Sequence, residues 1–80
     1  MQIKEAIMLR FQELCAQKEI KYNELATRAG VTPSTVYSMM DERRKDLSVI
    51  TVKKLCDGLD ISIAEFFGAE VFKNLEQEMK

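Results

Sequence analysis

Apolar residues recur along most of this chain at spacings of three and four, the period of an α-helix with one buried face. The first such stretch covers 3–18. Its inward positions are Ile3, Ile7, Phe11 and Leu14. After a short break the pattern resumes over 22–29, and Gly30 ends this second helix because glycine enters the left-handed region without a Cβ clash. We therefore predict two helices before residue 30.

A third helix is predicted directly after this turn. Thr32 followed by Pro33 is typical of a helix start, because the hydroxyl accepts a free backbone N–H while proline has none to leave unpaired. Val36 and Met39 have the spacing of inward positions, and Met40 is also expected to be core. The outward face then consists of Pro33, Ser34, Tyr37 and Ser38. Two short helices joined by so tight a turn cross steeply, so that one of them projects.

Six consecutive charged residues follow over 41–46 and predict a surface loop. Ser48 is placed to cap a fourth helix that ends near Gly58. Ser62 and Glu65 have the spacing of a capping box at the start of a fifth helix. The inward residues of these two helices are Val52, Leu55, Cys56, Leu59, Phe66 and Phe67. The predicted fold class is all-α.

Length and composition limit the kinds of function. Eighty residues, 46% of them hydrophobic and 31% charged, predict one folded domain. We expect a cytoplasmic protein, because no segment has the length and apolarity of a membrane span or a signal peptide. The chain has no histidine, and Cys15 and Cys56 have no metal-ligand spacing, so we expect buried thiols and no metal, cofactor or enzymatic activity.

Charge is distributed unevenly along the chain, although the net charge is only −1. Residues 1–56 contain ten Lys and Arg against seven Asp and Glu, whereas residues 57–80 contain two against six. A mildly basic part beside an acidic part is compatible with one face that binds nucleic acid. It is also compatible with an ordinary solvated charge distribution.

Three segments give the sequence a specific resemblance. They are Leu25-Ala26, then 29–36 (Ala-Gly-Val-Thr-Pro-Ser-Thr-Val), and finally 51–59 leading into 61–67. With these spacings, residues 3–67 resemble the Cro/phage-repressor-like helix-turn-helix regulators, also called the XRE family. The resemblance implies a five-helix, lambda-repressor-like domain that binds double-stranded DNA, commonly as a dimer, with its third helix in the major groove. It implies no cofactor and no small-molecule ligand.

The resemblance also implies which residues touch DNA. The expected base contacts are Pro33, Ser34, Tyr37 and Ser38. The expected backbone contacts are Tyr22, Asn23, Thr32, Thr35, Arg43, Arg44 and Lys45. Among these, Tyr22 takes the place of a glutamine that often binds a phosphate at the start of the second helix. The charged run that contains Arg43 to Lys45 is, on the alternative interpretation, only a solvated loop.

This sequence departs from the family pattern at several positions. Pro33 replaces the usual polar side chain, although its ring could meet a thymine methyl group. Lys21 stands where a capping Thr or Ser is common. Arg10 corresponds to an arginine whose usual acidic partner is here Met40, which leaves Asp41 or Glu42 as substitutes.

The segment 68–80 keeps apolar residues at helical spacing and is predicted to be a helical extension. The stripe consists of Phe67, Val71, Phe72, Leu75 and Met79. Either a sixth helix folds back on its own core, or the stripe meets the same stripe of a second copy. We favour the dimer contact, because two half-sites are the usual way in which small domains of this kind gain specificity.

The function predicted from the sequence is that of a DNA-binding transcriptional regulator, a repressor acting as a dimer. The alternative is a protein-interaction module of the same fold, such as an antitoxin-like partner, which the acidic pI of about 5.4 favours. Binding to DNA that weakens steeply with salt would distinguish the first from the second.

Overall fold

The computed structural model describes residues 1–79 and is built from helices. In chain order these are α1 (Ile3–Lys18), α2 (Tyr22–Ala29), α3 (Pro33–Met39), α4 (Val49–Gly58), α5 (Ile63–Phe67) and the short 3-10 helix η1 (Glu70–Phe72). The described residues contain no strand. The all-α prediction with five α-helices is therefore confirmed, and the predicted bounds of α1 and α2 match the structure.

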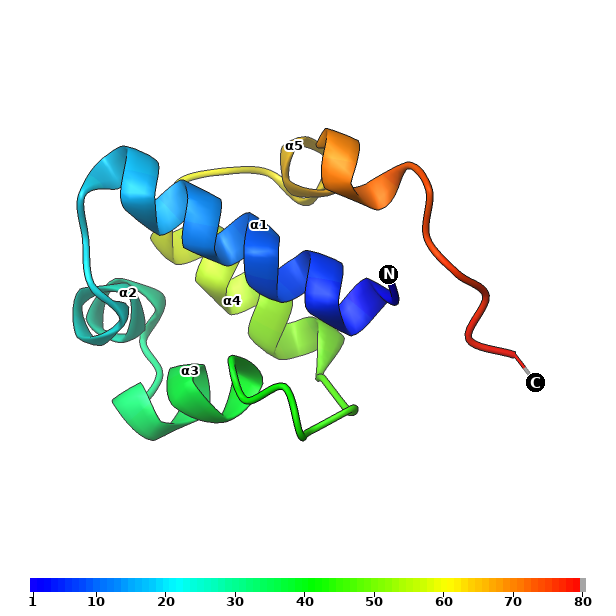
Figure 1. Ribbon diagram of the computed structural model, residues 1–80. Helices are drawn as coiled ribbons and strands as arrows, with labels where there is room; N and C mark the ends of the chain where they lie inside the picture. The colour runs from blue at the N-terminus through cyan, green and yellow to red at the C-terminus, as the bar shows by residue number, and fades with distance from the viewer. Residues whose placement is uncertain (80) are drawn as a thin grey trace.

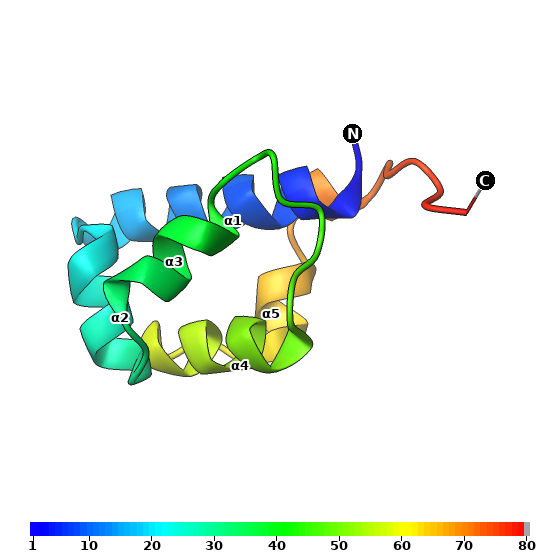
Figure 2. The same cartoon turned by 90° about the horizontal axis from the view of Figure 1, so that it is seen from below.

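One hydrophobic core lies between the helices, whose arrangement is shown in Figures 1 and 2. α1 and α4 lie on opposite sides of it, α2 closes one end, and α3 and α5 cover two further sides (Figure 2). The fully buried large side chains are Phe11, Leu25, Val36, Leu55, Leu59 and Phe66. The rings of Phe11 and Phe66 meet at the centre with centroids 4.5 Å apart, which joins α1 to α5.

Three serine and threonine caps start the later helices where the sequence predicts them. The Thr32 hydroxyl accepts a hydrogen bond from the Thr35 N–H at 3.3 Å at the start of α3. Ser48 accepts the N–H groups of Ile50 and Thr51 at the start of α4. Ser62 and Glu65 form the predicted capping box of α5. Each cap satisfies backbone donors that a helix leaves free in its first turn, and so fixes where the helix begins.

The α2 and α4 helices approach each other at Gly58, the last residue of α4. A Cβ atom at this position would lie 2.8 Å from the backbone nitrogen of Ala29. Sequence analysis assigned Gly58 only to the end of the helix, but the structure shows that it also allows two backbones to approach closely. This contact sets the position of α2, on which α3 packs.

Arg10 has different partners from those expected. Its guanidinium donates to the backbone oxygens of Phe66 at 2.9 Å and Glu65 at 3.0 Å, and it pairs with Glu13 one turn along α1. The suggestion that Asp41 or Glu42 replaces its family partner is therefore wrong. Arg10 instead satisfies the carbonyl groups that the end of α5 leaves free.

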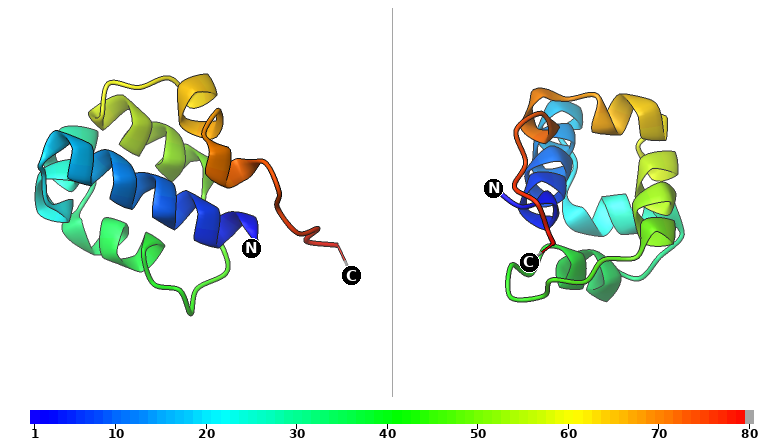
Figure 3. Two further views of the ribbon diagram at one scale, coloured as in Figure 1. Left: turned by 45° about the horizontal axis from the view of Figure 1, so that its top comes forward. Right: turned by 90° about the vertical axis from the view of Figure 1, so that its right-hand side faces the viewer.

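The C-terminal segment also differs from the continuous helix expected over 68–80. It contains the three-residue η1, and Lys73 to Met79 form turns and irregular chain (Figure 3). The ring of Phe72 packs on Phe67 and Phe66, with centroids 4.9 and 5.7 Å away. Positions 67 and 72 would point about 140° apart on an α-helix, so the chain must leave the helical path for both rings to share one cluster. Lys80 lies outside the described residues.

Two further expectations concern the cysteines and the length of the helices. Cys15 and Cys56 are both buried and free, as predicted. Within residues 1–79, no helix is both long and apolar enough to cross a membrane.

Candidate nucleic-acid interface

The α2 and α3 helices form a tightly connected pair. Gly30 adopts a left-handed conformation with φ of 71°, and the next residue, Val31, donates its N–H to the Ala26 oxygen at 3.0 Å. Ala26 and Val36 are both fully buried, so the two helices cross on small and medium side chains. This packing leaves the opposite side of α3 facing solvent.

The predicted base contacts lie on or beside this outer side of α3. Pro33 and Ser34 are exposed, 54% of Tyr37 is exposed, and Ser38 is half-buried. Ser34 and Ser38 line a cleft of about 300 Å³ that lies between α3, the following loop and the start of α4. Pro33 and Tyr37 do not line this cleft, so the four residues are divided between the cleft and the surface next to it.

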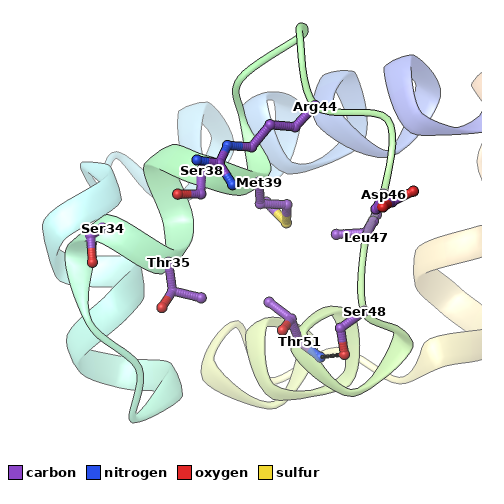
Figure 4. Close-up of a pocket in the computed structure, with 9 residues that line it drawn as sticks. All are labelled: Ser34, Thr35, Ser38, Met39, Arg44, Asp46, Leu47, Ser48 and Thr51. Atoms are coloured by element: carbon purple, nitrogen blue, oxygen red, sulfur yellow. Dashed lines mark hydrogen bonds between the residues drawn. The ribbon is translucent and has the colours of Figure 1, made fainter.

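Residues from α4 and the loop complete the cleft (Figure 4). Thr51 points toward α3 from the first turn of α4, and Ser48 lies beside it at the N-cap. Arg44 extends from the loop to Ser38. Sequence analysis did not select Ser48 and Thr51 as site residues. It assigned Ser48 the role of a helix cap and included Thr51 only in the segment 51–59 that carries the family resemblance. Their polar character at the start of a helix that follows a basic loop was the only available indication.

Three hydroxyl groups are gathered at the N-terminus of α3. The Thr32 oxygen lies 2.9 Å from that of Ser34 and 3.0 Å from that of Thr35. A hydroxyl can donate one hydrogen bond and accept others, so this cluster keeps donors and acceptors available at the surface. The predicted contacts Thr32, Ser34 and Thr35 are thus brought together.

Tyr22 and Tyr37 are held against each other at the exposed junction of α2 and α3. Their ring centroids are 5.6 Å apart and the planes meet at 75°, an edge-to-face arrangement. Burial raises the pKa of the Tyr22 phenol above its ordinary value of 10.0. The hydroxyl is protonated at neutral pH in either case and can donate a hydrogen bond. Asn23 is exposed next to it, and the N-cap residue Lys21 provides no side-chain cap to α2. The first N–H groups of α2 therefore still offer donors, as expected where a phosphate binds.

The basic residues of the 41–46 loop differ in whether their side chains are already bound to another residue of the loop. Arg43 is bound within the loop, because its guanidinium donates to the two Asp41 oxygens at 3.1 and 3.0 Å. The Arg43 N–H also donates to Asp41 at 3.0 Å, and these bonds lower the pKa of the Asp41 carboxyl to about 2. Arg44 and Lys45 are exposed. Arg44 lines the cleft with the α3 residues, whereas Lys45 lies on the other side of the loop, near α1.

A buried lysine of α1 is hydrogen-bonded to the backbone of this loop. Lys4 of α1 is only 8% exposed, and its ammonium donates to the backbone oxygens of Asp41 at 3.2 Å and Arg44 at 2.6 Å. Sequence analysis assigned it no structural role. Its position, three residues before the inward Ile7, was the indication that it faces inward.

Two short helices that are joined by a tight turn and packed across each other, with the second exposed on its outer side, are the arrangement of the helix-turn-helix class of DNA-binding proteins. Residues 10–71 match the family described as the Cro/C1-type HTH DNA-binding domain. The chain belongs to the Cro/C1-type helix-turn-helix family, and the resemblance stated above is confirmed.

A solved structure gives the same result for the fold. The chain is similar to the structure described as "Crystal structure of the prophage Lp1 protein 11", with a TM-score of 0.80 and 32% sequence identity. The match covers 94% of this chain and 100% of the other. No curated protein matches the sequence.

Proposed function

We propose that this protein is a sequence-specific transcriptional regulator that inserts α3 into the major groove of double-stranded DNA and represses a promoter. The observation that carries the proposal is the cleft beside α3, where Ser34 and Ser38 lie with Arg44. Seven residues make a helix roughly 10 Å long, which fits a major groove about 12 Å wide. The proposed activity is binding in the cytoplasm, without chemical conversion of the DNA.

The proposed contacts fall into two groups. Pro33, Ser34, Tyr37 and Ser38 would face base edges, because they occupy the exposed side of the projecting helix. The groups that would bind phosphates surround them on α2, at the start of α3 and in the loop. They are Tyr22, Asn23, Thr32, Thr35, Arg43, Arg44 and Lys45. Within this group we rank Arg44 above Arg43, because Arg43 already has Asp41 as its partner. We also rank it above Lys45, because Lys45 lies on the side of the loop near α1.

We further propose that the protein binds as a homodimer through the C-terminal stripe. Met79 is 79% exposed, while Val71 and Leu75 are half-buried. The rings of Phe67 and Phe72 pack in the aromatic cluster around Phe66. In the proposed dimer they would therefore support the more exposed residues of the stripe from within the same chain. Two copies would place two α3 helices on successive turns of the duplex, which multiplies the number of base pairs contacted.

The test begins with selection of bound fragments from random DNA, followed by affinity measurements on the selected duplex at several salt concentrations. A regulator of this kind loses affinity steeply with salt, because each phosphate contact releases counterions. Ser38→Ala is expected to change the preferred sequence, whereas Arg44→Ala should weaken all sequences about equally. Failure to select any sequence, together with weak binding independent of salt, would contradict DNA recognition and favour a protein-binding module.

Oligomeric state is tested separately by light scattering at tens of micromolar, with and without residues 69–80. A dimeric mass that is lost on deletion supports the stripe as the contact. A monomeric mass in both samples, and on the selected duplex, would contradict the dimer and leave DNA binding to be judged by the salt dependence.

A further inference from the structure

The ammonium group of Lys4 is in an unusual place for a lysine. Lys4 is 8% exposed, and among the charged residues that the structure describes it is the one that is buried. Removing an ammonium from water is costly unless it is well hydrogen-bonded. A buried lysine therefore indicates that its partners matter, and here the partners are two backbone oxygens of the loop rather than a carboxylate.

Those two oxygens belong to opposite ends of one turn. The Arg44 N–H donates to the Asp41 oxygen at 3.0 Å, which closes a four-residue turn from Asp41 to Arg44. Lys4 donates to the same Asp41 oxygen and to the Arg44 oxygen, so one ammonium holds both ends of the turn. These two bonds cross from α1 to a loop about 40 residues away in the sequence.

The other bonds of the turn lie within the loop or at the end of α3. Asp41 holds Arg43, and the Asp41 N–H donates to the Ser38 oxygen at 3.2 Å. Neither bond determines where the Arg44 end of the turn lies relative to α1. Lys4 supplies that connection.

Arg44 is the residue whose position depends on it. The Arg44 side chain lies in the cleft with Ser34 and Ser38, on the side proposed to face DNA (Figure 4). The Lys4 ammonium is directed at the backbone oxygens of Asp41 and Arg44 and not at the cleft, which Lys4 does not line. Its effect on binding must therefore pass through the loop.

We propose that Lys4 is a positioning residue for DNA binding, which fixes the 41–44 turn so that Arg44 is held in place for a phosphate before DNA arrives. The inference rests on the proposed DNA-binding function and adds a residue of α1 to it. Fixing the backbone that carries a cationic side chain reduces the conformational freedom lost when that side chain binds. Loss of Lys4 should therefore lower affinity although no contact to DNA is removed.

The test compares Lys4→Met with Lys18→Met in the full chain. Both changes remove one positive charge from α1, but Lys18 is exposed at the far end of the helix. Binding to the selected duplex is expected to weaken about tenfold for Lys4→Met and less than about twofold for Lys18→Met, given typical coupling between contacting residues. The dependence of log affinity on log salt should also become shallower by roughly one phosphate contact for Lys4→Met.

A double-mutant cycle with Arg44→Ala separates positioning from a general loss of stability. If Lys4 acts through Arg44, adding Arg44→Ala to Lys4→Met should cost less than about threefold, whereas Arg44→Ala alone should cost about tenfold. Amide hydrogen exchange of Arg43 and Arg44 in the free protein should become faster in Lys4→Met while exchange in α2 is unchanged. The shorter Lys4→Gln serves as a second variant if Lys4→Met unfolds at the assay temperature.

Each outcome has a defined meaning. Unchanged affinity and salt dependence in Lys4→Met, or costs that add fully with Arg44→Ala, would overturn the positioning role while leaving DNA binding intact. A native chain that binds no selected or random duplex at low salt would overturn both the proposed function and this inference.

Discussion

The carboxylate of Asp41 holds the guanidinium of Arg43 by two hydrogen bonds, from Nε to Oδ1 at 3.1 Å and from Nη2 to Oδ2 at 3.0 Å. Such a two-bond pair leaves fewer donors for a phosphate and must be broken or shared when DNA approaches. Among residues 1–79 the neighbouring Arg44 forms no such pair, and it lies in the cleft. Two adjacent arginines with the same charge therefore have different availability.

We predict that Arg44→Ala weakens binding to the selected duplex about tenfold and that Arg43→Ala weakens it about threefold or less, since an occupied guanidinium gains little from a phosphate. Fluorescence anisotropy at moderate salt gives both values. Asp41→Asn is the matched control, because it frees Arg43 and should enlarge the effect of removing that arginine. Equal losses for the two arginine variants would contradict the different roles assigned here.

The Asp41 carboxyl should titrate well below its ordinary range. Its hydrogen bonds to Arg43 lower its pKa to about 2 in the folded chain, from an ordinary value of 3.8. A depressed pKa means that the folded state favours the ionised form, so the stabilisation is present above about pH 4 and is lost as the pH falls through about 2. Near neutral pH the pair is therefore expected to be insensitive to pH.

Carbon-detected NMR of the Asp41 carboxyl measures this directly, with a midpoint near 2 in the native chain and a higher midpoint in Arg43→Ala. A midpoint near 3.8 in both chains would show that the pair does not form in solution.

Gly58→Ala should destabilise the fold, although alanine favours helices. The added methyl group would lie 2.8 Å from the Ala29 nitrogen, and backbone cannot move aside as a flexible side chain can. Overpacking of this kind costs about 1 to 3 kcal/mol, which thermal or urea unfolding can measure. Lys54→Ala, at an exposed position of the same helix, is the control and should change stability by less than about 0.5 kcal/mol. A Gly58→Ala chain as stable as the control would contradict the close approach of α2 and α4.

The sequence was sufficient to predict most helix starts and the core, because both depend on local patterns. A cap such as Ser48 and a spacing such as that of Leu55 and Leu59 act within one or two turns, and both features are present in the structure. The Ser62 and Glu65 box is of the same kind. These elements could be predicted because their causes are close in sequence.

The remaining features depend on backbone groups far away in the sequence. Lys4 and Arg10 both donate to backbone oxygens of distant segments, and a carbonyl group has the same chemistry at every residue. The break after Phe67 has a similar origin, because the helical spacing of the tail continued while packing of Phe72 on the core required a turn. The close approach of α2 and α4 at Gly58 could not be predicted from the sequence, because a glycine at the end of a helix is already explained by the helix end itself.

Both cysteines should resist modification in the native protein. Burial raises the pKa of the Cys15 thiol, and it raises that of Cys56 to about 11. The thiolate is the reactive form, so at pH 8 a disulfide reagent should react with the native chain at least about tenfold more slowly than with the unfolded chain. Counting released chromophore with and without guanidinium checks this, with two equivalents expected only after unfolding. Rapid reaction of either thiol in the native chain would show that its surroundings open easily.

The contact between Tyr22 and Tyr37 links affinity to specificity, because Tyr22 is proposed to bind a phosphate while Tyr37 is proposed to face the bases. The two rings pack edge to face with centroids 5.6 Å apart. Tyr22→Phe keeps this packing and removes only the hydroxyl, so we expect a loss of about threefold to tenfold on every sequence, the value of one hydrogen bond. Tyr22→Ala also removes the ring against which Tyr37 rests, and it should change the preferred bases as well. Repeating the random-DNA selection with both variants tests this difference. An altered preference in Tyr22→Phe would contradict the assignment of the Tyr22 hydroxyl to a phosphate, and an unaltered preference in Tyr22→Ala would contradict the support of Tyr37 by the Tyr22 ring.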